Sequence, residues 1–182
     1  MVDAATRAWL IDQARQWSRT ERNAHQPLAV PLPAAARPGL ASFFTRATLD
    51  RARWRWVPGI DNPPWRDEAI ARGVPAALDF TRLVGLTHDD TILLSRAQAL
   101  GDQPPPRLLF HELVHVVQYG VLGVDTFVAQ YVDAYLAGED YWLIPLELVA
   151  ISLEAKLAAA QGLADVFSVE ALVQKTVGLR LA

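Results

Sequence analysis

The chain has 182 residues, of which 52% are apolar and 20% are charged, a balance typical of a globular domain with a substantial core. Its formal net charge of −3 gives no electrostatic reason to expect nucleic acid as a partner. The chain has no cysteine, which excludes disulfides and thiolate zinc sites. Any zinc ion must therefore bind histidine and carboxylate side chains.

The sequence shows no targeting segment. It contains no run of about 18 apolar residues, so no transmembrane segment is expected. Its N-terminus lacks the basic start and apolar core of a signal peptide. We therefore expect a cytoplasmic protein, in keeping with the lack of cysteine. Signal-independent secretion would leave no trace in these patterns.

The first part of the chain is predicted to form a helix over residues 3–19, with Asp3 as its N-cap and apolar residues at helical spacing. Four prolines between residues 26 and 38 predict an irregular or extended arm. A short helix is expected over residues 38–47. Within residues 51–57, arginines at 53 and 55 alternate with tryptophans at 54 and 56, which predicts a half-buried strand.

The middle of the chain is predicted to contain a short helix over residues 65–73 and a strand over residues 91–94. Residues 88–90, just before that strand, are typical of a turn. The pattern over residues 77–83 is ambiguous. Residues 101–106 end in three prolines, which stiffen the entry to the helix that follows.

The C-terminal half is predicted to be helical. The expected helices are 107–119 with Gly120 as the stop, 125–137 with Asp125 as the N-cap, 145–161 with Pro145 in the first turn, and 168–179 with Ser168 as the cap. A small sheet followed by helices predicts an α+β fold. We divide the chain into an N-terminal helix and proline-bearing arm (residues 1–39) and one domain (residues 40–182).

The most specific motif is His111-Glu112-Leu113-Val114-His115, the H-E-x-x-H pattern of zinc peptidases. Residues four apart share one helix face, with Cβ atoms about 5–6 Å apart, so both imidazoles can reach one metal ion. The Glu112 carboxylate can then take a proton from a zinc-bound water. The alternative is a buried helix whose histidines merely pack, but polar groups among such apolar neighbours need partners.

A catalytic zinc ion usually has three protein ligands. The other histidines, His25 and His88, both precede the motif, so a downstream carboxylate is the better candidate for the third. Glu147 and Glu154 stand out because they lie among apolar residues. They are about 10 Å apart along one helix face, so only one can bind the metal. The patterns leave the choice open, because Glu147 also suits a first helical turn and Glu154 also suits a solvated face beside Lys156.

A longer block of residues extends the motif. It comprises Leu108 through Tyr119, Leu122-Gly123, Phe127, Tyr131, Tyr135, Gly138, and Tyr141 through Ala150, preceded by the strand at Thr91-Ile92. In these positions the chain resembles a widespread bacterial family of zincin-like zinc-peptidase domains of unknown function. Some members of this family occur in toxin and injection-system proteins. The resemblance spans about a third of the chain, residues 86–152.

The resemblance implies a zincin-like fold, in which a small β-sheet packs on the active-site helix. It implies a zinc ion bound by His111, His115 and Glu147, with Glu112 as the base, and so favours Glu147 over Glu154. Many relatives have a polar or acidic residue two positions after this glutamate, where the chain has Val149. The support that such a residue gives a metal ligand is therefore not expected from this position.

Peptide hydrolysis also needs a hydrogen-bond donor for the developing oxyanion. Tyr131, Tyr135 and Tyr141 are candidates, and Tyr141 is favoured because it is closest in sequence to Glu147. Each tyrosine is alternatively a core residue with a satisfied hydroxyl. His88 is another candidate, but its turn-like surroundings predict a surface position.

We therefore predict a zinc metallopeptidase that hydrolyses peptide bonds of a peptide or protein substrate. The alternatives are a zinc-binding, non-catalytic assembly or toxin-associated module and a metal-free helical domain with a chance motif. Gln118 is expected either to orient a ligand or to serve a surface or core role. The proline-bearing arm is a candidate cover for the active-site cleft. The patterns carry no information on the oligomeric state.

Overall fold

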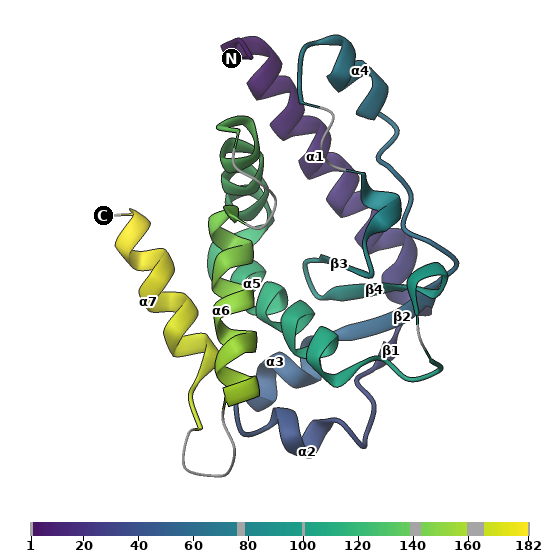
Figure 1. Ribbon diagram of the computed structural model, residues 1–182, viewed down its shortest axis with the longest axis vertical. Coiled ribbons are helices and arrows are strands. Elements are labelled where there is room, and N and C mark those ends of the chain that lie inside the picture. The colour runs from purple at the N-terminus through teal and green to yellow at the C-terminus, as the bar shows by residue number, and fades with distance from the viewer. Residues whose placement is uncertain (1, 76–78, 100, 139–142, 160–165, 182) are drawn as a thin grey trace.

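A computed structural model describes residues 2–75, 79–99, 101–138, 143–159 and 166–181 (Figure 1). Its α-helices are α1 (Ala4–His25), α2 (Arg37–Leu40), α3 (Arg46–Arg51), α4 (Arg66–Ala71), α5 (Pro106–Leu136), α6 (Pro145–Ala159) and α7 (Val169–Leu181). Its strands are β1 (Val30–Pro31), β2 (Arg53–Val57), β3 (Gly85–His88) and β4 (Thr91–Ser95). Short 3-10 turns occupy Gln26–Leu28, Phe80–Arg82 and Arg96–Gln98. The predicted α+β class is confirmed.

Helix α1 begins where the sequence predicts and ends six residues later than expected. The Asp3 carboxylate accepts a hydrogen bond from the Thr6 backbone N–H at 2.7 Å, so the predicted N-cap is confirmed. In the last turn of α1, apolar residues do not recur at helical spacing as they do in the first four turns. This turn is held instead by a tertiary contact, because the Arg22 guanidinium donates two hydrogen bonds to Asp90, at 3.0 and 2.8 Å.

The four strands form one mixed sheet in the order β1-β2-β4-β3. Strand β2 pairs in parallel with β4, while β1 and β3 pair antiparallel at the two edges. Strands β2 and β4 confirm the predictions for residues 51–57 and 91–94. The short edge strand β3 was not predicted, because Gly-Leu-Thr-His has little strand character and gains it by pairing with β4.

The prediction that His88 lies at the surface is wrong. His88 ends β3 and is 2% exposed. Its Nδ1 lies 3.3 Å from the Ser18 hydroxyl of α1, and its ring meets Trp17 edge-on with centroids 5.0 Å apart. Residues 89 and 90 make the turn, and α1 covers the hairpin end that the sequence alone leaves exposed.

Two helix boundaries also differ from prediction. The single helix expected over residues 38–47 is divided into α2 and α3. Helix α5 does not stop at Gly120 but continues to a kink at Gly123, where φ is 72° and ψ is 160°. Positive φ strains other residues, so this glycine carries the change of direction. Asp125 follows the kink, and its carboxylate pairs with Arg15 and Arg19 of α1.

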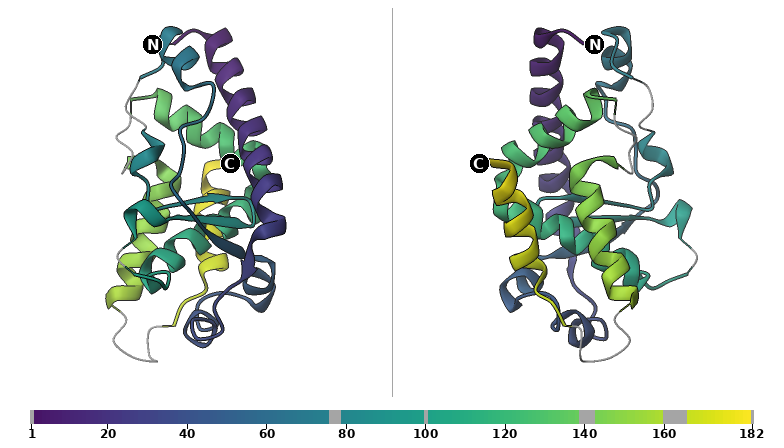
Figure 2. Two further views of the ribbon diagram at one scale, coloured as in Figure 1. Left: turned by 90° about the vertical axis from the view of Figure 1, so that its right-hand side faces the viewer. Right: turned by 60° about the vertical axis from the view of Figure 1, so that its left-hand side comes forward.

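Helix α5 lies at the centre of the molecule (Figure 2). Its first half packs between the sheet and the pair α6 and α7, around a core that includes Phe110, Leu113 and Ile92. Its second half packs against α1 and the start of α6, around a second core that includes Leu10, Phe127 and Ile144. The motif helix therefore stands where both cores meet.

The last two helices fit their predicted starts. Pro145 opens α6, and the Ser168 hydroxyl accepts a hydrogen bond from the Ala171 N–H at 3.2 Å at the start of α7. The expected end of the first of these helices, near residue 161, lies outside the described residues. Among the described helices, none has the length and apolar character to cross a membrane.

The burial of His88 predicts a specific loss of stability in acid. Burial lowers the pKa of His88 from 6.5 to about 3, with a smaller contribution from His25. The unfolded chain therefore takes up a proton near pH 6.5 and the folded chain does not. Stability is present above pH 6.5 and is lost as the pH falls toward 3, at up to about 1.4 kcal/mol per pH unit.

Urea denaturation of metal-free wild type and His88→Phe at pH 7, 6 and 5 measures this effect. The stability of the wild type relative to the variant should fall with each step. A difference that stays constant across the three pH values would contradict the burial of a neutral His88.

Candidate metal centre

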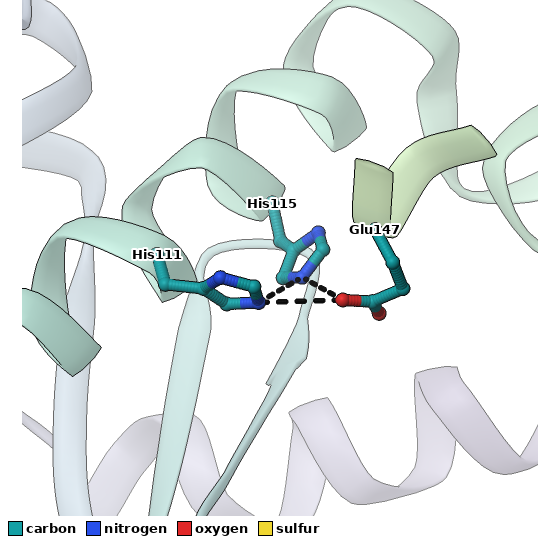
Figure 3. Close-up of side chains that lie close together, drawn as sticks. All are labelled: His111, His115 and Glu147. Carbon is teal, nitrogen blue, oxygen red and sulfur yellow. Dashed lines mark hydrogen bonds and ion pairs between the residues drawn. The ribbon is translucent and has the colours of Figure 1, made fainter. Parts of the chain in front are cut away.

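Two histidines of α5 form one side of the site. His111 and His115 are one helical turn apart, and their Nε2 atoms lie 3.2 Å from each other (Figure 3). The two rings meet almost at right angles, with centroids 4.9 Å apart. His115 is buried and His111 is half-buried.

Glu147 completes the site from the first turn of α6 (Figure 3). Its Oε2 lies 3.3 Å from His111 Nε2 and 3.5 Å from His115 Nε2. The residue is 3% exposed, and this oxygen has no hydrogen-bond partner among the described residues. A buried carboxylate oxygen without such a partner is costly, and it is therefore a place where a cation is expected.

The spacing of the three atoms fits a tetrahedral metal ion. Ligand atoms about 2.0–2.1 Å from a tetrahedral zinc ion are separated from each other by about 3.3–3.4 Å. The three sides of the observed triangle are 3.2, 3.3 and 3.5 Å. His111, His115 and Glu147 can thus hold a metal ion, and they are the three residues that the family resemblance implies in this role.

Gln118 fixes the orientation of His115. Its side-chain N–H donates to the Leu146 carbonyl at 2.9 Å, so its Oε1 faces His115 Nδ1, 2.8 Å away. The imidazole must donate from Nδ1 to this oxygen, which leaves the Nε2 lone pair directed at the metal position. Because Leu146 precedes Glu147, the same amide also joins the two ligand-bearing helices. The predicted orienting role of Gln118 is thus supported by its contacts.

Glu154 holds the other histidine. Its Oε2 lies 3.2 Å from His111 Nδ1, and its Oε1 pairs with Arg107. The interpretation of Glu154 as a solvated neighbour of Lys156 is wrong, because its side chain is only 14% exposed and lies against His111. It is not a member of the ligand triangle either. A carboxylate behind a histidine ligand fixes the imidazole and increases its basicity.

Against the effect of burial, electrostatic attraction between the Glu147 carboxylate and the imidazoles shifts the pKa values of Glu147 and His115. Burial disfavours charge on His115, but the nearby Glu147 carboxylate outweighs it and raises the pKa of His115 above its ordinary 6.5. Burial likewise opposes charge on Glu147, but His115 and His111 lower its pKa below the ordinary 4.5. A metal ion binds neutral imidazoles, so metal binding competes with protonation of His115 and is favoured at higher pH.

Glu112 lies beside the triangle and is held by strand β3. It is 4% exposed, and its Oε2 accepts a hydrogen bond from the Thr87 hydroxyl at 2.7 Å. Its Oε1 lies over Gly85, so close that a Cβ at that position would be only 2.5 Å away. Strand β3 thus positions the predicted base in two ways: the Thr87 hydroxyl donates a hydrogen bond to it, and Gly85 leaves room for it because glycine has no side chain. Neither Thr87 nor Gly85 is predicted from the sequence to belong to the site, because no local pattern links them to the motif.

The tyrosine candidates for the oxyanion have different positions. The Tyr131 hydroxyl donates to Glu147 Oε1 at 3.1 Å, so it supports the third ligand. The Tyr135 hydroxyl donates to the Pro75 carbonyl. Tyr141, the predicted donor, lies outside the described residues. His88 is not part of the metal-binding group.

No protein-family model, curated protein or solved structure matches the chain. The case for the site consequently rests on the geometry and chemistry of its own residues.

The roles of the two glutamates can be separated by metal binding. Glu147→Ala removes one of three converging ligand atoms and should abolish stoichiometric binding of added zinc. Glu154→Ala leaves all three atoms and should weaken zinc binding about 10–100-fold, as loss of a ligand's hydrogen-bond partner does. Elemental analysis after dialysis and chelator competition measure these effects.

The exposed Glu68→Ala, on α4, is the matched control and should bind zinc as the wild type does. Zinc retained by Glu147→Ala and lost by Glu154→Ala would transfer the ligand role to Glu154.

Proposed function

We propose that the chain is a zinc-dependent peptidase that hydrolyses peptide bonds, with His111, His115 and Glu147 as the zinc ligands. The observation that carries the proposal is the ligand triangle with a separate buried carboxylate, Glu112, beside it. A purely structural zinc site needs its ligands but no base. Two neutral imidazoles and one carboxylate, with no thiolate, are a ligand set of catalytic zinc sites.

The proposal includes a zincin-like fold. It is supported by an H-E-x-x-H helix packed beside a small mixed sheet, with the third ligand supplied by a later helix. This combination agrees with the resemblance of residues 86–152 to zincin-like bacterial domains. Both the arrangement and the resemblance point to the same three ligands.

In this proposal, the metal ion would supply a Lewis acid and the side chains of the protein would transfer the protons. A bound zinc ion supplies a Lewis acid and lowers the pKa of water from 15.7 toward about 7. Glu112 accepts the proton of the attacking water and passes it to the leaving amine. Thr87 donates a hydrogen bond to Oε2 of this carboxylate and so holds the base in position. Gln118 and Glu154 keep both imidazoles directed at the metal.

Removal of the base should separate metal binding from turnover. Glu112→Gln keeps the size of the side chain but removes its ability to accept a proton. It should bind zinc as the wild type does and lose at least about 100-fold in kcat on any peptide that the wild type cleaves. A peptide-library digest read by mass spectrometry finds the substrate.

Full activity in Glu112→Gln would refute the role of the base. A wild type that binds zinc and cleaves no peptide would favour the non-catalytic assembly module.

Gly85 gives a second test that leaves the carboxylate itself unchanged. A Cβ in Gly85→Ala would lie 2.5 Å from Glu112 Oε1 and 2.9 Å from its Cδ, so the carboxylate must move. We expect zinc content and thermal stability close to wild type and a loss of roughly 10–100-fold in kcat, because small displacements of a reacting group are costly.

The control for this test is Gly59→Ala, whose Cβ would meet nothing within 4 Å. Equal kcat in Gly85→Ala and Gly59→Ala would show that the contact between β3 and Glu112 does not position the base.

A further inference from the structure

A cavity of about 130 Å³ extends from the metal centre into the second core. Glu112, His115 and Glu147 are among the residues that line it. The remaining lining comes from α1, residues 63 and 65 before α4, α4 itself, the segment between α4 and β3, β3, and positions 119–135 of α5, and most of it is apolar. The cavity and the proposed reaction centre are therefore one continuous space.

Aromatic rings form the wall that leads away from the metal ligands. Phe127 lies 6.1 Å from the His115 ring and stacks on Tyr119, with centroids 3.7 Å apart. Across the cavity, Trp17 meets Phe80 edge-on at 5.1 Å. Such a lining offers large apolar faces and few polar groups, which suits an apolar group and not a charged one.

Helix α1 contributes Leu10, Ala14 and Trp17 to the lining. It is fastened at both ends: Arg22 binds Asp90 of the β3–β4 turn, and Arg7 donates two hydrogen bonds of 2.6 Å to Asp133 of α5. The N-terminal helix is thus built into the space next to the metal centre. Of the described residues that line the cavity, none belongs to the proline-bearing arm.

The volume limits what can enter. An engineered apolar cavity of about 150 Å³ binds one benzene molecule. A cavity of about 130 Å³ therefore has room for one group of similar size, such as the side chain of leucine, methionine or phenylalanine.

We propose that this cavity is the specificity pocket of the enzyme. It takes a leucine-sized to phenylalanine-sized apolar side chain of the substrate residue next to the cleaved bond, and α1 is the wall that sets its depth. This inference rests on the proposed peptidase function. Each methylene that enters such a pocket is worth about 10-fold or more in kcat/KM, so leucine and phenylalanine should exceed alanine by at least about 100-fold.

The test compares peptides that differ only at the residues flanking the cleaved bond. The wild type should prefer Leu, Met or Phe over Ala at one flanking position by at least about 100-fold in kcat/KM. Two variants fill the cavity from different helices, Ala14→Leu from α1 and Val128→Phe from α5. Either should reduce this preference at least about 10-fold and leave the zinc content close to wild type.

The matched control is Ala8→Leu, on the exposed face of α1. It should keep the wild-type preference, and thermal unfolding confirms that each variant is folded. Equal cleavage of Leu and Ala peptides by the wild type would overturn the proposal. So would an unchanged preference in both folded filling variants.

A second measurement needs neither zinc nor turnover. Fluorobenzene, followed by ¹⁹F NMR, should bind the metal-free wild type and Ala8→Leu, and bind Ala14→Leu at least about 10-fold more weakly. If fluorobenzene binds in this way and no peptide is cleaved, the peptidase function fails and the apolar site stands. If peptides are cleaved without side-chain preference and fluorobenzene does not bind, the pocket fails and the peptidase stands.

Discussion

Burial of the Glu147 carboxylate against two imidazoles is the constraint on which the rest of the molecule depends. An unpaired charge in such surroundings would cost several kcal/mol, so α6 can dock only where His111 and His115 meet it. The supporting contacts serve the same end, because Gln118 joins His115 to the residue before Glu147 and Tyr131 donates to the carboxylate. The junction of the two cores is therefore held by polar groups as well as by apolar packing.

The parts of the site that the sequence predicts are those encoded locally. His111, Glu112 and His115 occur within one helical turn, and helical geometry alone brings the two histidines together. Glu147 needed the resemblance to a family, because spacing along α6 could not separate it from Glu154. The position of Glu154 behind His111 depends on how α5 and α6 pack together, because the two residues are 43 positions apart in sequence. No pattern within either helix reports that packing.

In the fold, too, locally encoded features are predicted and features that depend on packing are not. Helices with an apolar stripe and a capping residue, such as α1 and α7, begin where the sequence predicts. Strand β3 and the burial of His88 were missed because both arise from contact with other elements, β4 in the first case and α1 in the second. The end of the motif helix was placed at Gly120 instead of Gly123, since a helix tolerates a glycine and only the backbone angle identifies the one that breaks it.

The kink at Gly123 divides α5 into two parts whose side chains have different roles. Before it stand the two histidines and Glu112; after it stand Phe127 and Val128, which line the cavity. The two parts still meet at the ligands, because Tyr131, beyond the kink, donates a hydrogen bond to Glu147. A change in the angle of this joint would therefore move the wall of the cavity and the support of Glu147 together, while the spacing of the two histidines, both before the kink, would stay the same. The kink thus couples the cavity to one side of the ligand triangle and not to the other.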